Sequence, residues 1–307
     1  MVITHVFPVF FLLLLGVALK KIGITDDAFL KTTDRMIYYI FFPLMLFWKI
    51  GAADQQFTDQ AVRFYIAVIC AVLVVYLLSI LVILSGRVTA FQAGAFSQSC
   101  YRFNTYVGMA VILSVLGEEG VALFGVMIGM AIPIINILAV STLIWFSGLP
   151  VAGSNRTTML GRSIISNPLI LGCAAGLLYA HWVNAFPLFV DNTFRLAAAV
   201  TLPLALLSIG GGLTLKSLTR YFGVAGTASV VKLLILPLVG YWIMNQMKVG
   251  GIHFKVGMIF FALPTSTAIY VLSSQLNSDT ELASAAIVLS TALSMVSLSV
   301  VLEWLYA

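Results

Sequence analysis

Long apolar runs separated by short polar segments fill the chain from one end to the other. Most of these runs are close to the about 20 residues with which a helix spans a bilayer, and they are too continuous for the strands of a membrane barrel. The pattern therefore predicts an all-α membrane protein with ten transmembrane helices. The predicted spans are 4–22, 34–52, 61–85, 90–117, 121–147, 162–181, 188–212, 219–246, 252–276 and 281–306.

The two halves of the chain repeat each other when the sequence is shifted by 160 residues. The longest polar connection, Ser147 to Arg162, lies between the halves. We expect a first five-helix repeat over 1–147, a connecting loop over 148–161 and a second five-helix repeat over 162–307. Prolines and glycines, which rarely coincide by chance, fall on each other at this offset: Pro8 with Pro168, Gly16 with Gly176, Pro43 with Pro203 and Gly51 with Gly211.

The odd number of helices in each repeat determines how the repeats are related. Five crossings bring the chain to the opposite side of the membrane, so the second repeat has to insert upside down. Inverted repeats of this kind are a transporter architecture, in which substrates bind near the midplane where interrupted helices meet.

Basic residues predict the orientation, because inner loops carry an excess of Lys and Arg. With the N-terminus outside, the inner connections hold nine of these residues and the outer connections five. Both termini are therefore expected on the periplasmic side of a bacterial inner membrane. The first apolar run, Val6 to Leu19, has neither a basic segment before it nor a small-residue cleavage site after it, so we expect a helix that is retained.

Composition excludes several classes of protein. Charged residues make up 9% of the chain and hydrophobic ones 61%, whereas a soluble domain carries about 25% charge. The basic excess of +5 comes from scattered residues at helix ends, which does not indicate a nucleic-acid partner. The three cysteines and three histidines lack metal-ligand spacing, so neither a metal nor a cofactor is expected.

Two polar interruptions stand out within the predicted spans four and nine: Gln98 to Thr105 and Ala262 to Thr267. They lie at matching places of the two repeats. Arg102 would lie deep in the membrane, where insertion scales assign it about 2.5–3.5 kcal/mol. It either extends its charged head to an interface or faces a wet cavity, and its polar neighbours favour the cavity.

These interruptions carry residue types that cap helix N-termini. If both spans break there, two half-helices begin at the midplane with the positive ends of their dipoles facing each other, which favours a bound anion. Asn136 in span five either lines the same cavity or forms a hydrogen bond between helices. The predicted substrate-binding residues are Arg102, Asn104, Thr105, Asn136, Pro264, Thr265 and Ser266.

Other intramembrane residues are interpreted structurally. Pro43 and Pro203 predict bends, and Gly125-x-x-x-Gly129 and Gly172-x-x-x-Gly176 predict close approach of helices. Lys232, in the middle of span eight, is a minor functional candidate unless its stem reaches the inner interface near Arg220.

Absent residue types also constrain the function. No acidic residue falls clearly inside the core of spans three, four, five, eight or nine, so antiport based on intramembrane carboxylates has little support. The chain lacks hydrolase, phosphate-binding-loop and metalloprotease motifs, and we expect no enzyme.

The motifs in these spans resemble those of the auxin efflux carrier family, the plant PIN-type transporters and their bacterial relatives, over nearly the whole chain. Phe103 stands where the family often has proline, which predicts a softer break in span four. The resemblance rests on Phe103-Asn104-Thr105 with Val107-Gly108, Ala262-Leu263-Pro264 with Leu276-Asn277, Asn167-Pro168, and Leu202-Pro203-Leu204-Ala205 through Gly210.

This resemblance implies a four-helix scaffold beside a six-helix transport unit, crossing broken helices four and nine, and elevator-type alternating access. It makes Asn104 and Pro264 the crossover residues and malonate-like, malate-like or auxin-like acids the substrates. We therefore expect a secondary transporter of small organic anions, with the bilayer as its environment. The alternative is a sodium-coupled symporter of the bile-acid type, and the sequence leaves a homodimer open.

Overall fold

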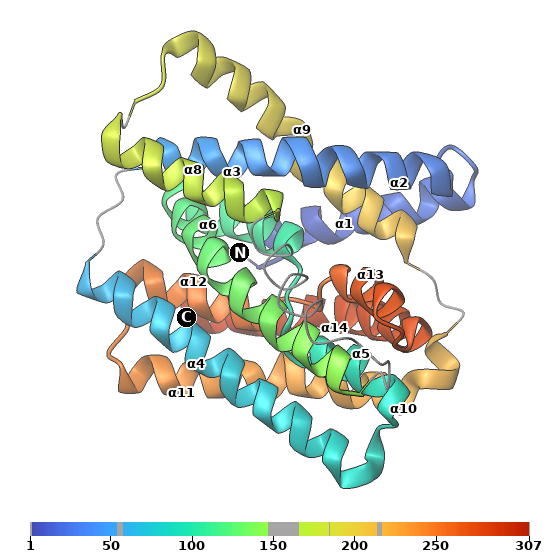
Figure 1. The fold of residues 1–307 in the computed structure, drawn as a ribbon. Coiled ribbons are helices and arrows are strands. Elements are labelled where there is room, and N and C mark those ends of the chain that lie inside the picture. Colours follow the sequence, from blue (N-terminus) through green and yellow to red (C-terminus); the bar gives the residue numbers. More distant parts are fainter. Residues whose placement is uncertain (1, 54–57, 147–165, 184, 214–216, 307) are drawn as a thin grey trace.

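The computed structural model describes residues 2–53, 58–146, 166–183, 185–213 and 217–306, and this part of the chain is helical without a strand (Figure 1). Its first half consists of α1 (Val2–Lys21), α2 (Asp27–Met36), η1 (Ile37–Phe41), α3 (Phe42–Gly51), α4 (Asp59–Val82), η2 (Ile83–Arg87), α5 (Ala90–Tyr101) and α6 (Thr105–Phe146). Its second half consists of α8 (Pro168–Trp182), α9 (Leu188–Gly212), α10 (Leu218–Val230), η3 (Val231–Ile235), α11 (Leu236–Gln246), α12 (Gly251–Ala262), α13 (Ala268–Gln275) and α14 (Thr280–Tyr306).

Several helical stretches are suited to a membrane. Among the described residues, 5 stretches are long and apolar enough to cross one, and α8 and α12 are shorter apolar helices. The all-helical, multi-pass prediction is confirmed at this level. The division into ten spans stays a prediction, and the expected connecting loop, 148–161, lies outside the described residues. The long stretches are Asp59–Arg87, Ala90–Phe146, Leu188–Gly212, Leu218–Gln246 and Thr280–Tyr306.

The helix α6 changes direction at Gly117, where φ is 64° and ψ is −153°. Glycine adopts this left-handed backbone without a steric penalty, because it has no Cβ. The polar segment that the sequence places between spans four and five is therefore a kink with helical flanks rather than a loop.

Two of the π-helical segments, η1 and η3, come directly before a proline near the start of the following helix, Pro43 and Pro237 respectively. Because proline lacks an N–H and its ring crowds the preceding turn, a widened turn accommodates it. The bend predicted at Pro43 takes this form, whereas Pro203 lies inside the α-helix α9.

The helices pack as two groups, which Figure 1 shows in its upper and lower parts. In the upper group α3 packs along α8 and α1 along α9. In the lower group α4 packs against α11, α10 against α14, and α5 against α14. The helix α6 contacts both groups, so it connects them.

Glycines set the closest approaches within the upper group. A Cβ on Gly16 of α1 would meet the carbonyl oxygen of Leu207 of α9, and a Cβ on Gly176 of α8 would meet that of Phe47 of α3 at 3.0 Å. Gly176 and Leu207 are the positions 160 residues after Gly16 and Phe47. The same contact is therefore made twice with the two halves exchanged. Gly172, too, has its closest neighbour in the backbone of Pro43, as expected for a small-residue face.

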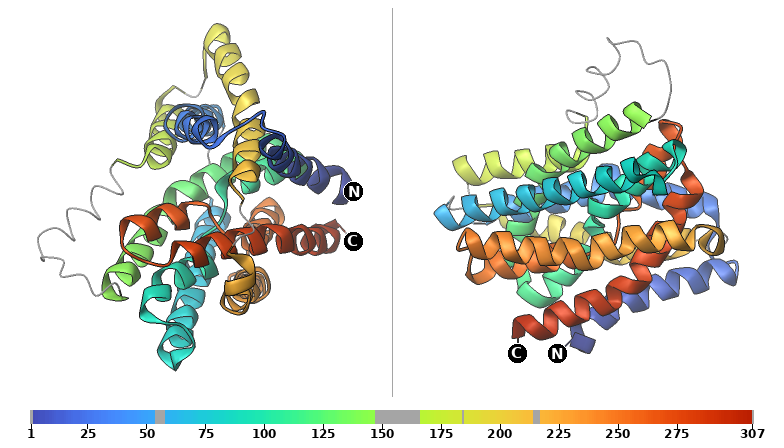
Figure 2. Two further views of the ribbon diagram at one scale, coloured as in Figure 1. Left: turned by 90° about the vertical axis from the view of Figure 1, so that its right-hand side faces the viewer. Right: turned by 90° about the horizontal axis from the view of Figure 1, so that it is seen from below.

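The start of α1 and the end of α14 lie near each other in both views of Figure 2. His5 Nδ1 lies 2.9 Å from Ser114 Oγ, and Tyr306 donates to the carbonyl of Val115 at 3.4 Å. Both helix ends thus meet the same turn of α6, which places them on one side of the molecule.

Candidate functional site

The two polar interruptions meet in the structure. The backbone N–H of Asn104 donates to the carbonyl oxygen of Pro264 at 2.9 Å. On both sides the incoming helix ends in extended backbone, with φ −67° and ψ 146° at Arg102 and φ −66° and ψ 148° at Leu263. Asn104 and Pro264 are 160 residues apart, so this bond joins equivalent positions of the two halves. The reciprocal bond is impossible, because proline has no N–H.

The break between α5 and α6 forms without a proline. Phe103, which stands at the family's proline position, is buried and packs its ring against Phe260 of α12, with the centroids 4.6 Å apart. Three residues between the two helices are non-helical all the same. The packing of Phe103 across the crossover thus holds a break that the local sequence alone leaves soft.

Asn104 caps the start of α6. Its Oδ1 accepts hydrogen bonds from the N–H groups of Tyr106 at 3.1 Å and Val107 at 3.2 Å, as the sequence predicts. The side chain is 1% exposed, and its Nδ2 has no hydrogen-bond partner within the described part of the chain. An amide donor of this kind is unusual in a protein interior, where most polar groups are paired.

The second break is held mainly by hydroxyl groups. Thr265 donates its hydroxyl to the carbonyl of Ser99 at 2.7 Å, and its N–H donates to Ser290 Oγ at 3.1 Å. Ser266 Oγ accepts from the N–H of Ala268 at 3.3 Å and so caps α13. The hydroxyl of Thr265 therefore donates its proton within the crossover, whereas the hydroxyl of Ser266 acts as an acceptor toward Ala268 and does not use its proton in that bond.

Arg102 lies inside the protein rather than at its surface. It is 8% exposed; Nη1 donates to Gln98 Oε1 at 3.2 Å and Nη2 to Asn136 Oδ1 at 3.1 Å. Asn136, on the second arm of α6, therefore both faces this site and bonds between helices.

Neutral partners leave the charge of Arg102 uncompensated. Among the described residues, the ion pairs within 4.0 Å are Lys20–Asp27, Lys49–Glu118 and Arg220–Glu281, and none of them includes Arg102. A guanidinium has five N–H donors, of which Gln98 and Asn136 take two. The guanidinium therefore keeps donors and a net positive charge, and Asn104 Nδ2, two residues along the chain, is a further unpartnered donor. Such a site suits a carboxylate, which only accepts hydrogen bonds.

Lys232 does not reach an interface. It is 0% exposed, and its ammonium donates to the carbonyl of Phe261 at 3.2 Å. Of the two alternatives for Lys232, the one in which its stem extends toward Arg220 and the inner interface is therefore excluded, because the carbonyl at the end of α12 holds the ammonium inside.

Sequence reasoning missed Ser290, which accepts the N–H of Thr265 from α14. The last predicted span carries many serines and threonines, and nothing in their spacing singles out this one. Gln98 was noted only as a polar neighbour of Arg102, although a four-residue spacing on one helix face predicts such a contact.

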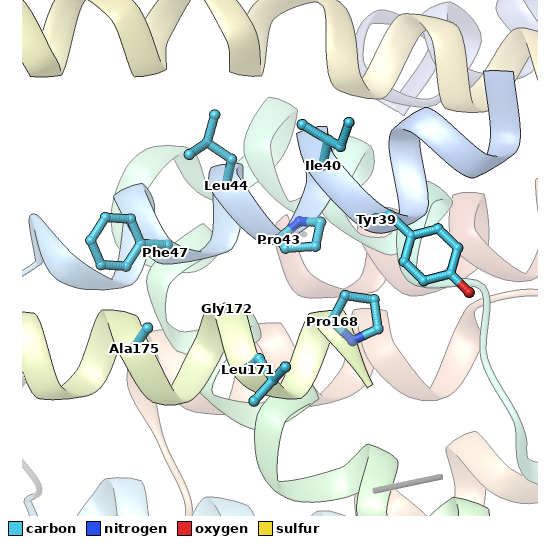
Figure 3. A pocket seen from close by; sticks show the side chains of 9 residues that line it. All are labelled: Tyr39, Ile40, Pro43, Leu44, Phe47, Pro168, Leu171, Gly172 and Ala175. Carbon is cyan, nitrogen blue, oxygen red and sulfur yellow. The ribbon is translucent and has the colours of Figure 1, made fainter. Parts of the chain in front are cut away.

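A separate groove lies between α3 and α8 on the side of the upper group, with a volume of about 440 Å³ (Figure 3). Pro43 and Pro168 face it from opposite helices. Its lining is apolar apart from the hydroxyl of Tyr39, and it includes none of the predicted substrate-binding residues. An apolar groove of this kind does not suit a carboxylate.

Comparisons with known proteins agree with this architecture. Two archaeal relatives are named uncharacterized transporters: one from Methanothermobacter thermautotrophicus, 25% identical and covering 95% of both chains, and one from Methanocaldococcus jannaschii, 23% identical over 94% of this chain and 93% of the relative. A protein of Rhizobium meliloti named "Putative malonate transporter" is 27% identical over 63% of this chain and 61% of its own.

The family model described as "Membrane transport protein" matches residues 1–302, almost the whole chain. This is the family to which the auxin efflux carriers belong, and two of the motifs that carry the resemblance, around Asn104 and Pro264, form the crossover described above. The chain therefore belongs to the membrane transport protein family, and it is a multi-pass membrane transporter.

Proposed function

We propose that this protein is a secondary transporter of small organic anions, mono- or dicarboxylates such as malonate or malate, or auxin-like acids. The observation that carries this proposal is the buried guanidinium of Arg102. Among the described residues its hydrogen-bond partners are neutral, and it lies two residues from the amide of Asn104, which has no partner there. A buried charge without a counter-ion is expensive, and a substrate carboxylate would compensate it. The relative from Rhizobium meliloti, whose printed name refers to malonate, supports the same class of substrate.

Each predicted residue has a role in this proposal. Arg102 neutralises the carboxylate, Asn104 donates through Nδ2, and Asn136 orients the guanidinium. Thr105 and Ser266 are both half-buried; Thr105 is the first residue of α6 and Ser266 lies just before α13, and the dipoles of these helix starts favour an anion. Pro264 and Thr265 hold the two breaks together rather than contact the substrate through their side chains.

We propose further that the chain consists of two inverted five-helix repeats that work by an elevator-type mechanism. The contacts that recur with the halves exchanged, Gly16 with Leu207 and Gly176 with Phe47, support the repeat. The grouping of α1, α2, α3, α8 and α9 apart from the remaining helices supports a scaffold beside a transport unit. The crossover would then move with α5, α6, α12 and α13 as one body.

The membrane potential gives such a carrier a direction. Moving one net charge through 100 mV is worth about 2.3 kcal/mol, so an inside-negative potential favours export of an anion from a bacterial cell whose inner membrane holds the protein. Import would need a coupled ion. The second candidate is therefore a sodium-coupled symporter of the bile-acid type, and dependence of transport on sodium would favour it.

Transport by purified protein in proteoliposomes tests the proposal. We expect uptake of labelled malonate or a related acid to fall strongly in Arg102→Ala and in Asn104→Ala. It should persist in Arg220→Ala, because this exposed arginine pairs with Glu281 and lies over the ring of Tyr221, away from the predicted site residues. Unchanged transport in both site variants would show that the site assignment is wrong.

A binding measurement supports the same test without transport. A carboxylate panel should include an acid that raises the melting temperature of the wild type, since a ligand at a hundredfold its Kd stabilises the folded state by about 2.7 kcal/mol. The same acid should have no effect on Arg102→Ala. Absence of any shift across mono- and dicarboxylates would overturn the organic-anion proposal.

A further inference from the structure

Lys232 is a second buried cation that the anion site does not use. It lies in the π-helical segment η3, is 0% exposed, and donates to the carbonyl of Phe261 at 3.2 Å. None of the ion pairs among the described residues includes it. A π-helical turn inside a longer helix often marks a functional position, and here it carries the one lysine of α10, η3 and α11.

The acceptor of Lys232 belongs to the end of a half-helix. The helix α12 ends at Ala262, and its last carbonyl groups lack partners from a continuing helix. These groups carry the negative end of the helix dipole. The ring of Phe261 lies against Gly240 of α11, where any Cβ would overlap it, so the residue that offers the carbonyl is held in place.

In carriers with inverted repeats, unwound carbonyls and C-terminal ends of half-helices coordinate the coupling Na⁺ or H⁺. The corresponding end of α12 is occupied here by an ammonium group of the protein. The ring of Phe260 is a further neighbour, with its centroid 5.9 Å from Nζ. Among the described residues no carboxylate is paired with Lys232, so a mobile cation would meet the ammonium there without a counter-charge.

We propose that the ammonium of Lys232 is a tethered cation, occupying the position at the end of α12 where a cation-coupled carrier binds its ion, and that it makes this transporter independent of sodium. The inference rests on the proposed transport function and specifies its coupling. The equivalent position of the first half is Val72, and the end of α5 instead receives the neutral hydroxyl of Thr265 at the carbonyl of Ser99. The tethered charge therefore exists at one of the two half-helix ends.

The first experiment measures cation binding without any substrate. The melting temperatures of purified wild type, Lys232→Ala and the control Lys255→Ala are compared in sodium chloride and in choline chloride at equal ionic strength. We expect no difference between the salts for the wild type and the control. Lys232→Ala, in which the removed side chain opens a space beside the carbonyl of Phe261, should melt about 2 °C or more higher in sodium.

The second experiment uses malonate transport in the same two salts. Wild-type transport should be equal in sodium and choline. Lys232→Met has a long side chain without the charge, and its transport rate should be about tenfold or more below that of the wild type in both salts. A sodium requirement of the wild type, or wild-type transport by Lys232→Met, would overturn the inference. If the variants do not fold, the response of the wild type to sodium still decides.

The two proposals fail in different ways. If no carboxylate stabilises the wild type, the anion substrate is wrong, whereas the comparison of sodium with choline in Lys232→Ala remains informative. If carboxylates bind but sodium also stabilises the wild type, the substrate class stands and the tethered cation is wrong.

Discussion

The two breaks of the crossover share a geometry and differ in chemistry. The backbone leaves α5 and α12 with nearly the same dihedral angles, and the two breaks are joined by the bond from Asn104 to Pro264. The first break carries its own charge, Arg102, and is capped by an asparagine. The second has a proline and hydroxyls, and its charge comes from Lys232 on another helix. The repeat thus accounts for the shared backbone geometry of the two breaks, and the side chains that differ between the halves account for their different charge and hydrogen bonding.

The largest effect should follow from removing the charge of the first break. Arg102→Gln keeps hydrogen-bonding capacity without the positive charge, and we expect transport to fall about 100-fold, since bonds to charged groups contribute about 1.5–3 kcal/mol. The melting temperature without substrate should stay equal or rise, because a buried cation with neutral partners is itself costly. A variant that melted lower and still carried substrate would point to a structural arginine.

The glycine contacts test how closely the helices of the upper group cross. A Cβ at Gly210 would meet the backbone of Leu13, and we expect Gly210→Ala to cost about 1–3 kcal/mol or more through overpacking. Gly176→Ala, with its nearest neighbours at 3.0 Å, should cost less. The measurement is folded yield and melting temperature in detergent. Gly226→Ala on α10 is the control, since nothing lies within 4 Å of its Cβ, and equal behaviour of all three variants would contradict the close crossing.

The helix caps compare the two breaks directly. Asn104→Ala removes two bonds to backbone N–H groups and should cost about 1–2 kcal/mol, whereas Ser266→Ala removes one bond of 3.3 Å and should cost about 0.5–1 kcal/mol. Chemical or thermal unfolding of both variants measures the difference. A larger loss for Ser266→Ala would mean that the second break depends on its cap more than on Pro264.

The smallest effect concerns the ion pair between the two helix groups. Lys49 at the end of α3 pairs with Glu118 beside the kink of α6 at 2.5 Å, and the side chains are 13% and 66% exposed. Because solvent screens such pairs, Glu118→Gln should change stability by at most about 1 kcal/mol. Transport rates should respond more than stability if the two groups move relative to each other, and identical rates would leave the pair without a role in that movement.

Much of the molecule could be predicted from residue patterns. Apolar runs predict the helices, and Asn104 and Ser266 predict caps that the structure contains, because capping depends on neighbours two or three residues away. The position of the Lys232 ammonium could not be predicted, because its flexible side chain can reach several acceptors and Phe261 is distant in sequence. Ser290 was missed for the same reason, because its bond to Thr265 exists only when α14 packs beside the crossover.

Residue patterns alone predict a multi-pass helical membrane protein, its family, and the two interruptions that hold its polar chemistry, because these follow from composition, periodicity and local capping. Three contacts emerge only from the folded arrangement: the interruptions meet through Asn104 and Pro264, Asn136 and Gln98 both bond to Arg102, and Lys232 bonds to the end of α12. Contacts between segments distant in sequence depend on how helices cross. In this chain the crossings follow from the fit of whole helix surfaces, such as Gly16 against Leu207, which no local pattern encodes.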